Sequence, residues 1–172
     1  DFIEDADKRF EFYNKKETKV PFNLEKLDKI TDGGLSNKTL NIALAGTGVG
    51  KSLFMCHMSA ACLQAGKKVL YITMEMAEER IAERIDANLL DVSMQDLREK
   101  VGYADWFDNN IKNLANDIEG RLIIKEYPTS SAHSGHFKAL IQELRLKRNF
   151  HPDIVFIDYL NICASSRIRA GS

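Results

Sequence analysis

The chain has 172 residues, 44% of them hydrophobic, which suits a single globular domain with a hydrophobic core. Its 24 Lys and Arg residues nearly balance 25 Asp and Glu residues, for a net charge of −1; this excludes a polybasic tail protein but not a nucleic-acid-binding one, because a local basic patch is sufficient. The three cysteines have no metal-site spacing, and no segment resembles a membrane span or a signal peptide, so the sequence predicts a reduced, cytoplasmic protein.

The N-terminal segment, residues 1–16, is predicted to be a helix. One face of it carries the apolar residues Ile3, Ala6, Phe10 and Tyr13. Pro21 disfavours helical backbone in the residue before it, so a short polar connection joins this helix to the rest of the chain. The apolar face requires a partner surface, either on the same domain or on a neighbouring subunit, and the pattern alone favours neither.

A short helix and a strand are predicted next. Asn23 can cap a helix that runs through Leu27 to Ile30, and Gly33-Gly34 ends it. The apolar run at residues 40–44 is predicted to be a strand that leads into a glycine-rich loop. A strand, a glycine loop and a helix in this order are the context that a phosphate-binding loop requires.

The glycine-rich loop at residues 45–52 reads Ala-Gly-Thr-Gly-Val-Gly-Lys-Ser and matches the relaxed phosphate-binding pattern, with Ala in place of the first Gly. Glycines allow successive N–H groups to point at one centre, and the following helix adds partial positive charge there. Lys51 is expected to reach the outer phosphates of a nucleoside triphosphate, and the Ser52 hydroxyl to hold Mg²⁺. The predicted nucleotide-binding residues are Gly46, Thr47, Gly48, Val49, Gly50, Lys51 and Ser52. The alternative is an ordinary glycine-rich turn that binds nothing.

Helices and strands alternate through the rest of the chain. A mostly apolar helix over 53–65 ends at Gly66, and further helices are predicted over 78–90, 95–100, 103–119 and around 137–144. Strands are predicted over 68–73, 122–124 and 154–157. The order βαβα…βαβ predicts a doubly wound, mostly parallel α/β sheet.

Two carboxylates follow predicted strands, at the edge where such sheets bind ligands. Asp158 ends the last apolar strand and is expected to orient the Mg²⁺ shell, partly through water; the alternative is a helix cap or a surface aspartate. Glu75 follows the strand 68–73 and could polarise the water that attacks the γ-phosphate; the alternative is a glutamate favoured by a helix dipole. The predicted catalytic residues are Glu75 and Lys51, and the predicted metal ligands are Ser52 and Asp158.

The histidines are interpreted as structural residues. His57 lies within the apolar helix after the loop and is expected to be a satisfied core or interface residue. His133 and His136 are expected to be surface residues of a polar loop rather than metal ligands.

Four motifs occur in a fixed order: Thr31-Asp32-Gly33-Gly34-Leu35, the loop 45–52, Met74-Glu75-Met76 with Arg84, and Asp158-Tyr159-Leu160. Together they resemble the RecA-type motor domain of DnaB-type replicative DNA helicases. The similarity is closest to the tailed-phage, T-even branch, through Lys19-Val20-Pro21-Phe22, Arg84-Ile85-Asp86-Ala87-Asn88 and Arg167-Ile168-Arg169.

The resemblance implies a ring-shaped homohexamer that hydrolyses ATP or GTP with Mg²⁺ between its subunits, translocates on single-stranded DNA and unwinds duplex DNA. It also implies primase and a helicase loader as partners, no membrane, and, for a phage protein, the cytoplasm of a bacterial host. Residues 1–18 match the linker helix that docks on the adjacent subunit, and residues 19–172 match the RecA-like P-loop NTPase domain. Matched residue by residue, Lys51 and Ser52 bind phosphate and Mg²⁺, Glu75 is the catalytic carboxylate and Asp158 belongs to the metal shell.

The family's motor continues past the position of Ser172, with a sensor strand, DNA-facing loops and an arginine finger for the neighbour's site. We therefore expect a linker helix and roughly the first two-thirds of a motor domain, with weak or no turnover in isolation. Two alternatives stay open: a RecA-type recombinase ATPase, which shares the loop and the glutamate, and a nucleotide-binding module without turnover.

Overall fold

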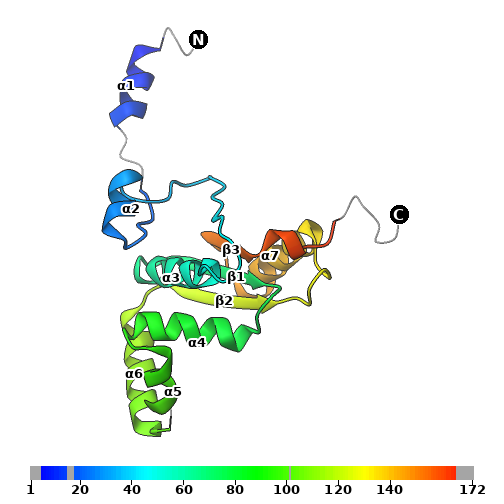
Figure 1. Ribbon diagram of the computed structural model, residues 1–172. Helices are drawn as coiled ribbons and strands as arrows, with labels where there is room; N and C mark the ends of the chain where they lie inside the picture. Colours follow the sequence, from blue (N-terminus) through cyan, green and yellow to red (C-terminus); the bar gives the residue numbers. More distant parts are fainter. Residues whose placement is uncertain (1–4, 15–17, 101, 166–172) are drawn as a thin grey trace. The chain divides into compact units, whose positions relative to one another are not determined.

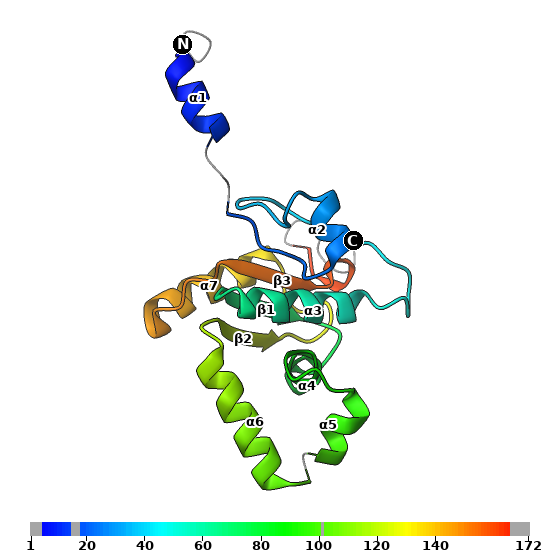
Figure 2. The same cartoon turned by 90° about the vertical axis from the view of Figure 1, so that its left-hand side faces the viewer.

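The computed structural model describes residues 5–14, 18–100 and 102–165 (Figure 1, Figure 2). The chain forms two compact units, Asp1–Ile42 and Ala43–Ser172. Ile3, residues 15–16 of the predicted first helix and the Arg167-Ile168-Arg169 motif lie outside the described residues. None of the described helices is long and apolar enough to cross a membrane.

The first unit holds two helices and one antiparallel bridge: α1 (Ala6–Asn14), α2 (Glu25–Ile30) and the pair Val20 and Leu35. The two bridge residues exchange hydrogen bonds of 2.9 and 2.8 Å between their backbone N–H and C=O groups. Gly34 beside them has φ of +117°, and a Cβ there would lie 2.0 Å from the Val20 carbonyl oxygen. The glycine is therefore required by a close approach of two backbone segments.

Helix α2 begins without the side-chain cap predicted from the sequence. Its N-cap residue is Leu24. Asn23 precedes the N-cap by one residue and has φ of 54°, in the left-handed region, so the predicted Asn23 cap is wrong. The acceptor comes from within the helix instead. The Asp28 carboxylate accepts hydrogen bonds from the backbone N–H groups of Phe22, at 2.6 Å, and Leu24, at 3.2 Å, and thus ties the incoming chain to the helix.

Helix α1 carries the aromatic residues of the predicted apolar face. The side chains of Phe10 and Tyr13 are 71% and 69% exposed, whereas Val20 and Phe22 further along are buried. Two large exposed aromatic side chains on one short helix provide a surface that another segment can cover.

The second unit is built on a parallel three-stranded sheet in the order β2-β1-β3, with strands β1 (Lys68–Thr73), β2 (Arg121–Glu126) and β3 (Ile154–Asp158). Its helices are α3 (Lys51–Gln64), α4 (Glu78–Leu89), α5 (Met94–Lys100), α6 (Ala104–Asp117) and α7 (Ser134–Arg148), followed by a 3-10 turn at Leu160–Ile162. Three of the four predicted strands are thus present, joined through helices. The predicted parallel α/β class is confirmed.

Helices cover both faces of the central strand β1, which is buried from Val69 to Thr73. On one face Leu70 and Ile72 pack in a cluster with Phe137 and Leu144 of α7. The opposite face carries Tyr71 and lies against α3. Both views show α5 on the side of α4 that faces away from the sheet, while α6 extends away from the start of β2 (Figure 1, Figure 2).

The strand predicted at residues 40–44 is not formed. These residues have no regular structure, and Leu40, Ile42 and Leu44 are 88%, 75% and 94% exposed. A strand exists only where a neighbouring backbone accepts its hydrogen bonds. The three described strands pair only with one another, so the apolar pattern of this segment finds no partner among the described residues.

The two histidines predicted for a polar loop belong to the start of α7. His133 is its N-cap and accepts a hydrogen bond at Nδ1 from Gly135 N, at 3.0 Å, while His133 N donates to His136 Nδ1, at 3.2 Å. This reciprocal pair has the form of a capping box, made here with imidazoles in place of the usual Ser and Glu. The loop interpretation was therefore wrong for His136, which lies in the first turn of α7 and is exposed, whereas His133 precedes the helix as its N-cap.

Candidate nucleotide-binding site

The glycine loop turns sharply before helix α3 begins at Lys51. Gly48 and Gly50 have φ of +76° and +105°, a region that residues with a Cβ rarely adopt. A Cβ on either residue would meet no atom within 4 Å, so glycine is required by the backbone conformation and not by crowding. Because these two residues have no side chains, a ligand can approach the backbone closely.

The other loop residues complete the turn. Val49 N lies 3.4 Å from the Gly46 carbonyl oxygen, and the side chains of Thr47 and Val49 are exposed. The first helical bond of α3 runs from Phe54 N to Gly50 O, at 2.9 Å.

The backbone N–H groups of Gly48, Gly50, Lys51 and Ser52 are among those at this turn that have no acceptor among the described residues. No side chain caps the helix, which is 14 residues long. Unsatisfied N–H groups at a helix start concentrate partial positive charge. A phosphate group can accept their hydrogen bonds, so the turn has the chemistry of an anion site.

The Lys51 side chain joins the loop to the end of β3. Its Nζ lies 3.4 Å from Asp158 Oδ1 and 3.4 Å from the centre of the Tyr159 ring. A cation over an aromatic face is attracted by the ring quadrupole. The lysine and the strand-ending aspartate that the sequence predicted for one site therefore lie side by side.

Asp158 is fully buried, with 0% of its surface exposed. Its Oδ2 accepts a hydrogen bond from the Tyr71 hydroxyl at 3.0 Å, whereas its Oδ1 accepts no hydrogen bond from a described residue. Burying a carboxylate oxygen without a partner costs free energy. Among the described residues, the Lys51 ammonium is the group that offsets this cost for Oδ1. This oxygen is thus free to accept one more donor or ligand.

Tyr71 connects Asp158 to helix α3. Its ring stacks on Phe156, two residues before Asp158 on the same face of β3, with ring centres 5.8 Å apart. Burial, followed by the nearby Cys56 and Asp158, holds the pKa of the Tyr71 hydroxyl well above its usual range, and burial raises the pKa of the Cys56 thiol to about 11. Both groups therefore stay protonated, and the tyrosine acts as a permanent donor to the carboxylate.

Glu75 is exposed in the turn after β1. It lies two residues beyond Thr73, which is in register with Asp158, so both carboxylates are at the carboxyl edge of the sheet. The turn is anchored on both sides: Thr73 Oγ1 bonds the backbone of Met76, and Met74 N donates to Asp158 O at 2.9 Å. The backbone that carries Glu75 is thus held in place at this edge.

The donor set suits Mg²⁺ better than a metal that needs an all-protein cage. Magnesium usually takes one or two protein oxygens and completes its shell with water and phosphate. Asp158 Oδ1, which accepts no hydrogen bond from a described residue, and the Ser52 hydroxyl, at the second position of α3, are two oxygens that could hold such an ion. No group of three or more His, Cys, Asp or Glu side chains arranged for a metal occurs among the described residues.

Sequence reasoning missed three residues of this arrangement: Tyr71, Thr73 and Tyr159. A tyrosine inside an otherwise apolar strand is a usable signal, because a buried hydroxyl seeks a partner. The partner could not be named without the register between β1 and β3. Tyr159 was visible only as part of a motif, with no indication that its ring contacts Lys51.

A family model described as "DnaB-like helicase C terminal domain" matches residues 19–171. Over 173 aligned residues the chain is 49% identical to a DnaB-like replicative helicase of Enterobacteria phage T4, with 100% of this chain and 36% of the relative covered. It is 28% identical over 135 residues to a probable plasmid replicative DNA helicase of Chlamydia psittaci, covering 77% of this chain and 28% of that protein. It is 25% identical over 152 residues to the replicative DNA helicase DnaB of Helicobacter pylori J99, covering 88% and 30%.

The chain therefore spans about a third of the length of these relatives. The family match covers nearly the whole of it, including the glycine loop, the turn with Glu75 and the end of β3. The chain belongs to the DnaB-like helicase C-terminal domain family, a RecA-like family of nucleotide-dependent helicases.

Proposed function

We propose that this chain is the NTP-hydrolysing motor portion of a hexameric replicative DNA helicase, which binds ATP or GTP with Mg²⁺, translocates on single-stranded DNA and unwinds duplex DNA. The observation that carries the proposal is the approach of Lys51 Nζ to within 3.4 Å of Asp158 Oδ1. This contact brings the start of helix α3, which no side chain caps, next to a buried carboxylate. A nucleotide site needs both parts, one for phosphate and one for the metal.

The phosphate-binding role rests on charge and on unsatisfied donors. The N–H groups of Gly48, Gly50, Lys51 and Ser52 would donate to phosphate oxygens, with Gly46, Thr47 and Val49 shaping the turn around them. Lys51 would add a charge-assisted bond to the outer phosphates. Ser52 and Asp158 would hold Mg²⁺, which when bound neutralises charge on the β- and γ-phosphate oxygens.

Glu75 is proposed as the residue that directs hydrolysis. Its carboxylate would accept a hydrogen bond from the attacking water and take up its proton as the water oxygen bonds to the γ-phosphorus. The bond from that phosphorus to the bridging oxygen breaks, and the diphosphate leaves with the electron pair. Glu75 is exposed and makes no hydrogen bond or ion pair with the described residues, so its carboxylate is available to water.

We further propose that residues 1–18 form a linker that docks on the adjacent subunit of a ring and that residues 19–172 belong to the motor domain. The exposed Phe10 of α1 supports this, since a large exposed aromatic side chain offers apolar surface that an adjacent subunit can cover. Primase and a helicase loader are proposed partners of the whole protein. Its proposed location is the cytoplasm of a bacterial host.

A conservative substitution in the full-length protein tests this function. Glu75→Gln should lower NTP hydrolysis and forked-duplex unwinding about 10²–10⁴-fold, while nucleotide affinity stays within about twofold, because only the proton acceptor is lost. Glu79→Gln is the matched control: it makes the same change on an exposed glutamate four residues away and should leave both activities intact.

Two results would contradict the proposal. Hydrolysis that survives Glu75→Gln would remove the assigned role of this carboxylate. Strand exchange without any unwinding by the full-length protein would instead favour a RecA-type recombinase.

A further inference from the structure

Strand β2 has an outer edge that no other described strand covers. Arg121 N and Tyr127 N, at its two ends, donate inward to the backbone of the β1 segment, at 3.2 and 2.9 Å. Since backbone groups alternate in direction along a strand, those of Leu122, Ile124 and Glu126 face outward. The bond from Glu126 N to the Glu78 side chain, at 2.8 Å, fits this alternation.

The carboxyl end of this edge is closed by a reciprocal pair. Glu78, at the start of α4, accepts from Glu126 N, and Glu126 accepts from Glu78 N, at 3.3 Å. The N–H and C=O groups of Leu122 and Ile124 have no partner among the described residues. The available edge is thus short and has a defined end.

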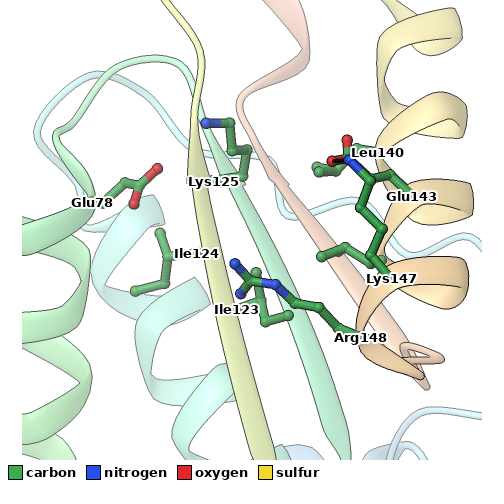
Figure 3. A pocket seen from close by; sticks show the side chains of 9 residues that line it. Glu78, Ile123, Ile124, Lys125, Leu140, Glu143, Lys147 and Arg148 are labelled. Atoms are coloured by element: carbon green, nitrogen blue, oxygen red, sulfur yellow. Dashed lines mark hydrogen bonds and ion pairs between the residues drawn. The ribbon is translucent and has the colours of Figure 1, made fainter.

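A groove of about 570 Å³ runs along this edge, between the start of α4 and helix α7 (Figure 3). Its walls are apolar at Ile123, Ile124, Leu140 and Leu144, and charged at Glu78, Lys125, Glu143, Lys147 and Arg148. Figure 3 shows Ile123 and Ile124 on opposite sides of the strand, so that the groove wraps the edge and does not lie on one face only.

Three cationic side chains and two anionic ones line the groove, so its net charge is positive. Lys147 pairs with Glu143, at 2.8 Å, and Glu78 accepts the Glu126 N–H while it keeps its negative charge. Lys125 and Arg148 form no ion pair with a described residue, and both are exposed. A ligand that offers carboxylates to these two cations and hydrogen bonds to the two outward backbone pairs would therefore complement the groove.

We propose that this groove is a docking site for an extended, acidic peptide segment of a partner protein, which adds as a strand alongside β2. An extended backbone is required, because a helix has already satisfied its own N–H and C=O groups and cannot pair with an edge. On one face of the added strand, alternate apolar side chains of the peptide would lie beside Ile124; on the other face, its carboxylates would meet Lys125 and Arg148. The site is separate from the glycine loop and does not depend on nucleotide hydrolysis.

The test uses a fluorescein-labelled decapeptide of alternating valine and aspartate, titrated into the full-length protein and followed by fluorescence anisotropy. We expect saturable binding with a Kd below about 1 mM and no saturable binding of the matched valine–lysine peptide. Equal binding of both peptides, or of neither, would overturn the proposal.

Two variants separate edge pairing from simple charge attraction. Ile124→Pro removes one outward N–H and is compatible with an edge strand; it should weaken binding about fivefold, whereas Ile124→Val should not. The exposed double variant Lys125→Glu/Arg148→Glu should weaken binding about tenfold. Hydrogen–deuterium exchange read at single residues gives an independent check. Peptide should slow the amides of Leu122 and Ile124, and binding without this protection would also overturn the proposal.

Discussion

Replacing Tyr71 with phenylalanine removes a single hydroxyl from the buried end of the candidate site. That hydroxyl donates to Asp158 Oδ2 at 3.0 Å, and both side chains have 0% of their surface exposed. The ring itself is retained, together with its stacking on Phe156 at 5.8 Å. The substitution therefore tests the hydrogen bond with little change in packing.

The expected cost follows from the burial of the carboxylate. A hydrogen bond to a charged group contributes about 1.5–3 kcal/mol, and here no water can replace the lost donor. We expect Tyr71→Phe to lower the unfolding free energy by about 2–3 kcal/mol. For a chain of this size that corresponds to a fall in Tm of about 5–10 °C.

Chemical denaturation and thermal melting measure this loss, with Tyr127→Phe as the matched control. The Tyr127 hydroxyl makes no hydrogen bond with the described residues, so the same change there should cost less than about 0.5 kcal/mol. A double-mutant cycle of Tyr71→Phe with Asp158→Asn should give a coupling energy of about 1–3 kcal/mol.

Nucleotide binding gives a second readout of the same bond. With its donor lost, Asp158 is no longer held in one orientation, so the Mg²⁺ dependence of nucleotide affinity should shift to higher Mg²⁺ concentration. Additive single mutants in the cycle, or equal destabilisation by the Tyr71 and Tyr127 substitutions, would refute the reasoning.

Two further predictions concern the backbone and the buried thiols. Gly34→Ala should destabilise the first unit by about 3 kcal/mol or more, because its Cβ would lie 2.0 Å from the Val20 carbonyl oxygen. Gly33→Ala, with φ of +98° but nothing within 4 Å, should cost about 1–2 kcal/mol. Amide exchange of Val20 measures both losses of stability, and equal losses would contradict the predicted clash at Gly34. Burial raises the pKa of Cys56 to about 11 and of Cys62 to about 12, from 9.0, so the unfolded state loses these protons at a lower pH than the folded state. The unfolding free energy should therefore fall by about 1 kcal/mol per thiol between pH 8 and pH 10. Urea titrations that show no change of unfolding free energy with pH, or a pH dependence unchanged by Cys62→Ala, would contradict this.

The helices and strands that bury their own apolar pattern could be predicted from the sequence. Strand β1 was expected over residues 68–73 and has those bounds. A short, continuously apolar run between two helices is typical of a strand that is buried on both faces of a parallel sheet. Helix α3 could likewise be predicted from its apolar composition. Gly66, shortly after its last residue, has φ of +72°, in the left-handed region.

Features that depend on a distant partner could not be predicted. Residues 40–44 have the apolar pattern of a strand, but a pattern does not specify which edge accepts the hydrogen bonds. Asn23 has the side chain of a cap, yet Asp28 provides the acceptor. The hydroxyl of Tyr71 meets Asp158, 87 residues away, a contact that only the strand register determines.

The residues of the candidate site divide in the same way. The glycine loop is a local motif, so Lys51 and its neighbours could be predicted from eight consecutive residues. Asp158 and Glu75 were placed at strand ends by topology. The contact of Lys51 with Tyr159 depends on side-chain direction and could not be predicted from residue order.

Nucleotide affinity of a Lys51 variant tests the central claim most directly. Binding of a fluorescent nucleoside triphosphate to the full-length protein, with Mg²⁺ present, is compared for Lys51→Ala and for the control Lys138→Ala, an exposed lysine on α7. Loss of a charge-assisted bond of about 1.5–3 kcal/mol predicts roughly 10–100-fold weaker binding for Lys51→Ala and unchanged binding for Lys138→Ala. Equal affinity of the two variants would show that the loop at residues 45–52 does not hold the outer phosphates.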